Sequence, residues 1–361
     1  RVDRPRLDYK GEGRFTYKLP KRGKLSLGGV KTREQYQQYN TAWHFNLPHF
    51  IARTYKSNFL NSGLNYAIGR TLVSIKGSYL NIGRYLAVRD THQENNPDDE
   101  RFSSDLKPRD WWEDYRYKGQ FIIDDGVVEK AEIVDTLTHY FKEFQTQNVD
   151  NPYGVGGLFF RGDNRYWEYY YSTEYSGRID IIHNIGKIHE FKTGFNLSYI
   201  EMGDYLNTLP WDLLPFYDIY QRSPIMGAVY LQDRIDWSGL IVRSGLRFDY
   251  LDANTRGVSA PYDTTKWVYA NPTYRISPRL GFSFPITDRI KFRFNYGHFF
   301  QVPPLDNLYG TTSPAVVRLA ILRGGQIIGN PEMHAKKTIQ YEFGFENQLS
   351  DVLSFDLTAY F

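Results

Sequence analysis

The C-terminal stretch KTIQYEFGFENQLSDVLSFDLTAYF, residues 337–361, decides the fold class. Apolar side chains occupy every second position from Ile339 to Phe345 and again from Leu353 to Phe361, on either side of a turn that contains Asn, Ser and Asp. The positions between them are mostly polar. Alternation with a period of two places the two sets on opposite faces of a β-hairpin. The apolar face needs a cover, which is either a protein core or a lipid bilayer.

The composition is compatible with both covers. The chain has 361 residues, of which 17% are aromatic, with 30 Tyr and 24 Phe. Its mean hydropathy is negative, and no apolar run approaches the roughly 18 residues of a transmembrane helix, which excludes a helical membrane protein. Alternating strands cross a bilayer while the average stays polar, because every second residue faces water. A transmembrane barrel and a soluble β-sandwich both remain open at this point.

Charge and cysteine content exclude several other classes. The formal net charge of +3 is too slight to indicate a nucleic-acid partner. There is no cysteine, so disulfides and thiolate metal sites are impossible. No signal peptide precedes Arg1, although an exported protein is made with one. We therefore expect mature numbering or a missing N-terminal part.

The alternating pattern recurs in pairs along the chain, which together with the final hairpin predicts about twelve strands. Each pair flanks a turn of about two to five residues that contains Gly, Pro, Asn or Asp. The pairs are Arg14–Leu19 with Lys24–Val30, Ser57–Ile68 with Leu72–Tyr85, Tyr169–Ile182 with Ile188–Ile200, Ile225–Trp237 with Leu240–Leu251, and Pro278–Phe284 with Ile290–Phe300.

The connections between pairs are long, at roughly 86–165, 201–224, 252–277 and 301–336. Structureless loops beyond about 15 residues are uncommon in compact soluble domains. Strict alternation of short turns and long loops is typical of outer-membrane barrels. The polar face of the strands is charged, as the lumen of such a barrel is, with Lys76, Arg178, Lys192, Arg243, Arg247, Arg293, Glu342 and Glu346.

Two of the long loops are predicted to contain short helices. Apolar residues spaced by three and four between Val127 and Phe144 form one helical face, and Asp124-Asp125-Gly126 is a suitable start. Ser313-Pro314, followed by an apolar run and Gly324, has the features of an N-cap, a first-turn proline and a terminating glycine. We expect both helices to lie over the extracellular mouth.

Three stretches, Ala228–Asp252, Ser277–Gly310 and Gly329–Phe361, resemble the barrel of TonB-dependent outer-membrane receptors, especially the large Bacteroidetes-like group. They cover about a quarter of the chain, follow the family's order, and match jointly in strand, turn and loop residues. The likeness is weaker after Asn330-Pro331, because Met333-His334-Ala335-Lys336 stands where family members tend to have Leu, Lys-Pro and Glu.

The resemblance implies an active-transport receptor in the outer membrane of a Gram-negative bacterium. Such a receptor has a barrel of about 22 strands, an N-terminal plug domain and a short box that engages TonB. It takes up a scarce nutrient, which in this family is a siderophore, cobalamin, a glycan or a peptide. The expected partners are outer-membrane lipid, the TonB complex and an extracellular small ligand, without nucleic acid or cofactor.

No plug or TonB box is recognisable before Arg14, and the final hairpin normally precedes further strands in the resembling family. We therefore expect 1–361 to be one partial receptor barrel domain, with the plug and C-terminal strands missing. Two alternatives stay open. One is a small outer-membrane barrel enzyme or adhesin that is complete at Phe361, an aromatic residue on the outward face. The other is a soluble β-sandwich that acts as a binding module.

The candidate substrate-binding residues are basic or aromatic. Arg243, Arg247 and Arg293 face the lumen in the receptor interpretation, although they could instead pair with carboxylates such as Asp249 and Glu342 of the strands or with the plug. Trp211, Phe216 and Tyr217 lie in a long loop beyond the membrane. Trp167, Tyr169, Tyr170, Tyr171, Phe299 and Phe300 are interpreted as belonging to an interfacial aromatic girdle rather than a ligand site.

Other site-like motifs are interpreted as structural. The acidic run Asn95–Glu100 lacks the ligand spacing and central Gly of an EF-hand loop, so we interpret it as a solvated loop. Gly154–Gly157 is not followed by Lys-Ser/Thr, which a phosphate-binding loop requires. We do not expect a metal site from His183 and His189, which flank a turn. We find no catalytic constellation of Ser or paired Asp with His, and the chain is predicted not to be an enzyme.

Overall fold

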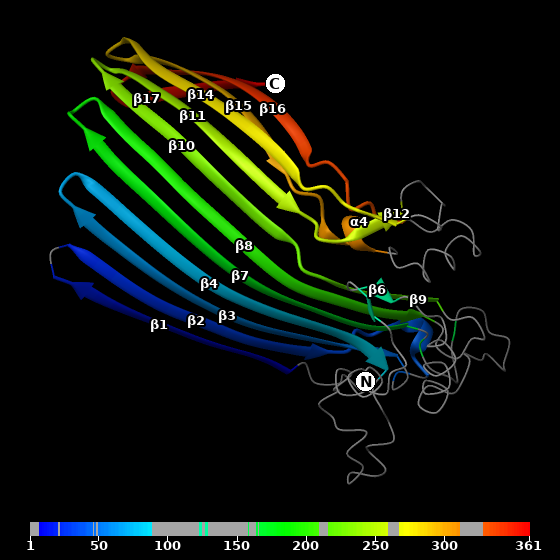
Figure 1. Ribbon diagram of the computed structural model, residues 1–361. Coiled ribbons are helices and arrows are strands. Elements are labelled where there is room, and N and C mark those ends of the chain that lie inside the picture. Colours follow the sequence, from blue (N-terminus) through cyan, green and yellow to red (C-terminus); the bar gives the residue numbers. More distant parts are fainter. Residues whose placement is uncertain are drawn as a thin grey trace.

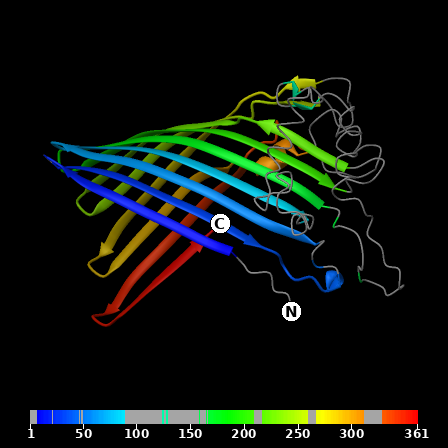
Figure 2. The same cartoon turned by 90° about the horizontal axis from the view of Figure 1, so that it is seen from below.

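A computed structural model of the protein describes residues 7–20, 22–45, 47, 50–88, 123–124, 127–128, 158, 164, 166–208, 216–258, 267–310 and 328–361. Within these ranges no helix is long and apolar enough to cross a membrane. Nearly all of the regular structure is β, in one curved antiparallel sheet (Figures 1 and 2).

Twelve long strands form the sheet, in the order β1-β2-β3-β4-β7-β8-β10-β11-β14-β15-β16-β17. Strand neighbours in sequence are neighbours in space, and every pair is antiparallel. The prediction of an antiparallel all-β fold with about twelve strands is confirmed. The strands are β1 Leu7–Leu19, β2 Gly23–Tyr36, β3 Ile51–Ile68, β4 Thr71–Val88, β7 Tyr166–Ile185, β8 His189–Thr208, β10 Ile225–Trp237, β11 Leu240–Asp252, β14 Thr273–Thr287, β15 Ile290–Gln301, β16 Lys336–Ser350 and β17 Leu353–Tyr360.

Short turns and long connections lie at opposite ends of the sheet (Figure 1). The hairpin turns span two or three residues, whereas the other connections are much longer. In the two-residue turn between β10 and β11, both Ser238 and Gly239 have positive φ, at 49° and 87°. That backbone matches the right-handed twist of the flanking strands. We call the two ends the turn end and the mouth.

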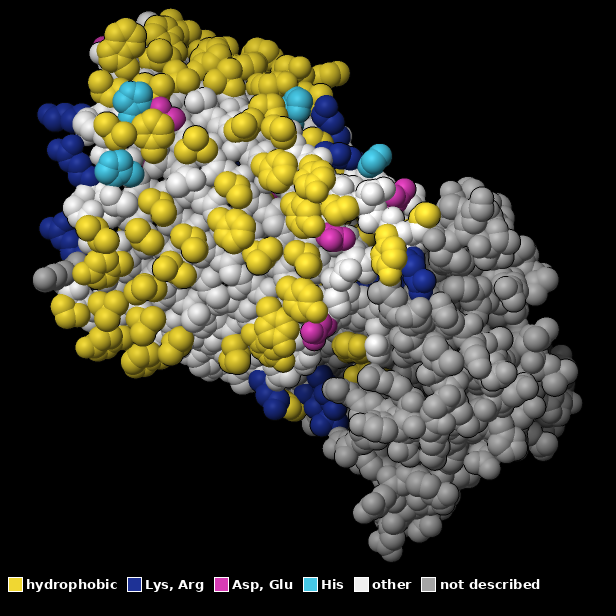
Figure 3. Space-filling view, viewed as in Figure 1, with side chains coloured by type: hydrophobic (Ala, Val, Ile, Leu, Met, Phe, Trp, Pro, Cys, Tyr) yellow, Lys and Arg dark blue, Asp and Glu magenta, His cyan; other side chains and the backbone are white. Residues whose placement is uncertain are grey.

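The outer face of the sheet is apolar, as Figure 3 shows across most of the surface of the strands. Leu231 is 55% exposed, Leu246 54% and Phe343 49%. Exposure of this extent over neighbouring strands exceeds what the surface of a soluble monomer usually carries. Lipid can cover this face, because paired strands satisfy their backbone N–H and C=O groups within the sheet and present only side chains to the hydrocarbon.

A row of tyrosines closes this apolar band toward the mouth. Their rings lie on neighbouring strands with centroids 5.0–6.5 Å apart, in the pairs Tyr79–Tyr175, Tyr175–Tyr199, Tyr250–Tyr274 and Tyr296–Tyr341. Beyond the row the same face becomes polar. Asn81 donates a hydrogen bond to Thr173, and Thr173 lies opposite Glu201. Tyrosine belts of this kind mark a membrane interface, so the residues beyond Glu201 lie outside the bilayer.

The predicted loop helices are only partly testable. The predicted helix start is wrong where the structure describes it: Ile123–Asp124 (β5) pairs with Val127–Val128 (β6), and β6 pairs with Tyr220 of β9 (Phe216–Arg222). The two apolar residues Val127 and Val128 thus extend a sheet instead of lining a helical face. The remainder of that segment and the helix predicted at 313–324 lie outside the described residues. The described helices are η1 Thr41–Trp43 and α4 Leu305–Tyr309.

The mouth contains the buried core of the protein. Strand β9 and helix α4 pack on the mouth ends of β8 and β11, where Met202, Tyr220, Leu308 and Tyr309 are at most 2% exposed. The Tyr309 hydroxyl donates a hydrogen bond to the carbonyl of Ala253 over 2.7 Å. This hydrogen bond fixes helix α4 against the sheet at the end of β11, more than 50 residues earlier in the chain.

Candidate functional site

Alternation brings charged side chains from successive strands onto the inner face of the sheet, which we call the lumen face. Residues directly opposed in an antiparallel pair share a face. Lys192 opposes Gln232, Arg247 opposes Tyr230, and Arg279 opposes Gly245 in the register. The lumen face of β8, β10, β11 and β14 is therefore one continuous polar surface.

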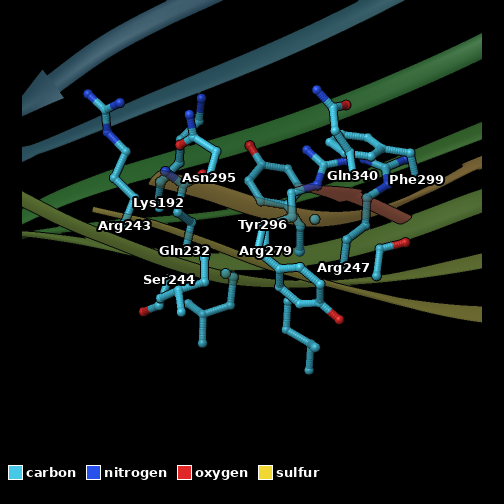
Figure 4. A pocket seen from close by; sticks show the side chains of 18 of the residues that line it. Lys192, Gln232, Arg243, Ser244, Arg247, Arg279, Asn295, Tyr296, Phe299 and Gln340 are labelled. Carbon is cyan, nitrogen blue, oxygen red and sulfur yellow. The ribbon is translucent and has the colours of Figure 1, made fainter. Parts of the chain in front are cut away.

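A hollow of about 490 Å³ lies in this surface. In Figure 4 the side chains of Arg243, Arg247 and Arg279 rise from one side of the sheet, with Asn295 and Gln340 beside them, whereas Ser244 lies on the other side. These side chains come from four strands, β11, β14, β15 and β16. The hollow is placed within the span of the sheet, away from the core at the mouth.

Inward-facing glycines allow the neighbouring side chains to lie close to the wall. A Cβ at Gly281 would stand 2.6 Å from the Asn295 Oδ1, and one at Gly297 would stand 2.9 Å from the Phe299 ring. Gly245 is next to Gln232, with 3.4 Å between its added Cβ and that of Gln232. Side chains at Gly281 and Gly297 would displace residues that shape the hollow, whereas one at Gly245 would fill space beside Gln232.

Two of the cations that line the hollow are neutralised by carboxylates. Arg178 Nε lies 2.8 Å from Asp180 Oδ2, and Arg247 Nε lies 2.8 Å from Asp249 Oδ1. Both pairs join residues two apart on one strand, which alternation places on the same face. Asp180 also accepts a hydrogen bond from the Tyr230 hydroxyl. Arg247 is thus placed as predicted on the lumen face, and it pairs with the strand carboxylate Asp249.

The other three cations at the hollow are Lys192, Arg243 and Arg279. In the part of the chain that the structure describes, none of them lies within ion-pair distance of a carboxylate. The guanidinium of Arg279 lies over the Phe299 ring, 4.8 Å from its centroid, a favourable cation–π contact. Arg243 and Arg279 are exposed on the lumen face, where no other described residue covers them.

Arg293 faces the lumen but lies outside the hollow. It contacts Asp356 over 2.8 Å and Glu342 over 3.9 Å, and it donates a hydrogen bond to the Thr358 hydroxyl over 2.7 Å. Of the three arginines singled out from the sequence, the structure therefore brings Arg243 and Arg247 together at the hollow and separates Arg293 from them.

The aromatic candidates are distributed differently from the sequence interpretation. Trp211 lies outside the described residues. Phe216 and Tyr217 begin β9, and their backbones pair with the mouth end of β8. Phe299 lines the hollow, and Tyr170 lies beneath Arg84 with 5.3 Å between the guanidinium carbon and the ring centroid. Neither belongs to the lipid-facing girdle, because their positions in the alternation point inward.

His183 and His189 do not form a site together. His183 Nδ1 lies 2.8 Å from the Thr71 hydroxyl, and His189 Nδ1 lies 2.8 Å from Asp233 Oδ2. Over the described ranges, no group of three or more His, Cys, Asp or Glu side chains has a geometry that could hold a metal ion. The acidic run at 95–100 and the glycines at 154–157 fall outside those ranges.

A second charged cluster, at the mouth, is acidic. Asp204 of β8 lies near Glu168 of β7, Asp218 of β9 and Asp306 of α4, with Arg84 of β4 as counter-charge. Burial, followed by repulsion from Glu168 and Asp218, raises the pKa of Asp204 to about 8. Arg84 forms an ion pair with Glu168, which also accepts a hydrogen bond from the Tyr166 hydroxyl over 2.6 Å.

Arg279 was absent from the sequence-based candidates, although a usable signal exists. Pro278 lies next to it inside β14 and obscures the alternation at that point. Continuing the period of two backward from Ser283 through Gly281 assigns Arg279 to the lumen face. The acidic cluster carries no comparable signal, because Glu168, Asp204, Asp218 and Asp306 stand in four separate elements.

Comparison with known proteins identifies the class. The sequence profile described as "TonB dependent receptor-like, beta-barrel" matches residues 32–361. The chain belongs to this family, whose barrels lie in the outer membrane of Gram-negative bacteria and serve transport rather than enzymatic catalysis. A search of curated protein sequences found no match. The narrower Bacteroidetes-like assignment stays a prediction.

Solved structures share the fold. The chain is similar to a Serratia marcescens hemophore receptor HasR in complex with its hemophore HasA and heme, with 10% identity and a TM-score of 0.56 over 98% of this chain and 45% of that one. It is also similar to the FrpB iron transporter of Neisseria meningitidis (F3-3 variant), with 10% identity and a TM-score of 0.54 over 98% of this chain and 45% of that one. The outer membrane transporter YddB of Escherichia coli is similar as well, with 11% identity and a TM-score of 0.53 over 96% of this chain and 38% of that one. The chain spans less than half the length of these structures.

Proposed function

We propose that the chain is part of the wall of an outer-membrane active-transport receptor, which takes up a scarce nutrient with energy coupled through TonB. The observation that carries this proposal is the family match over 32–361. The two-faced sheet supports it, because an apolar outer face with a charged inner face is what a water-filled or plugged barrel requires. Siderophores, cobalamin, glycans and peptides are the candidate nutrient classes.

We further infer that residues 1–361 are one partial barrel domain. Strands β1 and β17 each have one partner within the described sheet and form its two edges (Figure 2). An open edge exposes unpaired backbone groups, which cost several kcal/mol each in hydrocarbon. Additional strands that close a barrel of about 22 would remove both edges. A plug segment that engages TonB would complete the receptor.

The proposed substrate-facing residues are Arg243, Arg247 and Arg293 on the lumen wall and Trp211, Phe216 and Tyr217 toward the mouth. Arg243 is the strongest of these, because it lines the hollow without a carboxylate partner among the described residues. A complete small barrel enzyme or adhesin that ends at Phe361 is the alternative function, and no geometric observation in the described residues favours it.

Uptake experiments test the transport proposal. The full receptor is expressed in a Gram-negative host that lacks its own receptors, with and without its tonB gene. Growth is scored under limitation for iron or cobalamin, with heme, ferric siderophores or cobalamin supplied, and on single glycans or peptides. We expect receptor-dependent growth on at least one nutrient that disappears without TonB. Growth that depends on the receptor but persists in the tonB deletion would contradict energy coupling.

A further inference from the structure

The geometry points to an anion-binding subsite in the lumen wall, formed by Lys192, Arg243 and Arg279. It rests on the proposed function, because it names the class of solute that the transport barrel would accept: small molecules that carry several carboxylate or phosphate groups. The subsite lies at the hollow, between the apolar outer face and the open lumen, and away from the core at the mouth.

Charge imbalance is the first argument. The residues that line the hollow include five cations, Arg178, Lys192, Arg243, Arg247 and Arg279, and one carboxylate, Glu342. Asp180 and Asp249 neutralise Arg178 and Arg247 from the same strands. Glu342 accepts a hydrogen bond from Asn295 over 3.3 Å and lies toward Arg293. With Asp180, Asp249 and Glu342 counted against the five cations, two positive charges are left in excess, and a concave wall with an excess of one sign attracts counter-ions.

The donor chemistry is the second argument. The planar guanidinium groups of Arg243 and Arg279 can each bind a carboxylate or a phosphate through two parallel hydrogen bonds. The stack on Phe299 limits the motion of Arg279, so less entropy is lost when a ligand binds. Amide groups of Gln232, Asn295 and Gln340 line the same hollow and add neutral donors around the charged ones.

The space is the third argument. Gly245, Gly281 and Gly297 stand beside these cations in the register, so the wall recedes between the long side chains. A volume of about 490 Å³ lies in the range of small-molecule sites. The competing occupant is a carboxylate-bearing surface of the domain that fills the barrel. The recess at the three glycines favours the small anion, and the titration below separates the two occupants.

Calorimetric titration of the full receptor in detergent tests the subsite, with citrate as the carboxylate probe, inorganic pyrophosphate as the phosphate probe and spermidine as the cationic control. We expect the anions to bind and spermidine not to bind. The triple variant Lys192→Gln, Arg243→Gln, Arg279→Gln should weaken anion binding by at least about tenfold, because charge-assisted hydrogen bonds are lost. Arg243→Gln alone should give part of this effect.

Lys76→Gln is the matched control, because Lys76 is a lumen-facing cation of β4 outside the hollow. It should leave anion affinity unchanged, and heat-modifiable migration verifies that every variant is folded. Absence of anion binding, or equal anion affinity in the wild type and the triple variant, would overturn the subsite. If the triple variant in that case also had lower thermal stability, the hollow would be a docking surface for the lumen-filling domain. TonB-dependent uptake without anion binding would overturn the subsite and leave the proposed function intact. Anion binding with TonB-independent uptake would support the subsite and contradict the proposed energy coupling.

Discussion

The hollow and the mouth are two charged regions on the same lumen face, and they differ in what covers them. At the hollow, Arg243 and Arg279 are exposed and have no carboxylate partner among the described residues. At the mouth, Glu168 of β7 and Asp218 of β9 are buried. Alternation alone places charge on an inner face. Whether that charge can meet a solute depends on the segments that fold over it.

The largest effect is expected from the cover of the mouth. Leu308 is fully buried in the core, and Leu308→Ala should cost about 2–5 kcal/mol of local stability. Hydrogen exchange of the full receptor should show lost protection in β9 and α4. The half-buried Leu305→Ala should cost less. Unchanged exchange in Leu308→Ala would mean that α4 does not hold the mouth core together.

The second effect distinguishes the two faces of a single strand. Leu231 lies on the lipid-facing side of β10, and its neighbour Gln232 lines the hollow. Leu231→Arg should destabilise the barrel by about 2–4 kcal/mol, as basic residues do near the bilayer midplane. Gln232→Arg should be tolerated. The yield of folded receptor in the outer membrane measures both, and equal yields would argue against the assignment of faces.

The membrane part of the strands could be predicted from the sequence, whereas the mouth could not. The turn at Ser238-Gly239 and the bounds of Ile225–Trp237 were predicted correctly, because alternation is strict where one face meets lipid. Above the tyrosine row both faces are polar or aromatic, as at Asn81 and Thr173, so the pattern fades. The predicted start at Tyr169 therefore falls short of the observed start of β7 at Tyr166.

Helix α4 and the acidic cluster were missed for a different reason. The helix has five residues and no hydrophobic period. It is held by Tyr220 and Ala253, which are distant in sequence. The cluster around Asp204 exists only after four elements have assembled. Such tertiary placement overrides local propensity and has no sequence signature in a single chain.

The third effect is a pH dependence confined to the mouth. Asp204 has a raised pKa of about 8 in the folded state against an ordinary value near 4. A folded pKa above the unfolded one means that stability is complete at low pH and is lost as pH rises toward about 8. The loss is about 1.4 kcal/mol per pH unit within that window.

Hydrogen exchange of β8 and β9 between pH 5 and pH 8, corrected for intrinsic rates, measures this dependence. Asp204→Asn should flatten it, because the amide does not ionise. The hollow residues of β11 and β14 provide the internal reference and should show the same protection in both proteins. A wild-type mouth whose protection rises with pH would contradict the assigned sign.

The smallest effect is expected at Arg293, whose ion pairs with Asp356 and Glu342 are partly exposed. Arg293→Gln should change the free energy of unfolding by less than about 1 kcal/mol. It should also leave anion affinity at the hollow unaltered. A large loss of affinity in this variant would extend the subsite beyond the three cations assigned to it.

The central claim is that one face of this sheet meets lipid and the other meets the lumen. Spin labels placed singly at each position from Val242 to Asp249 in the full receptor, reconstituted in bilayers, test it directly. Collision rates with molecular oxygen, which partitions into lipid, should alternate with a period of two and peak at Val242, Ser244, Leu246 and Phe248. A profile without alternation, or with peaks at Arg243 and Arg247, would contradict the account.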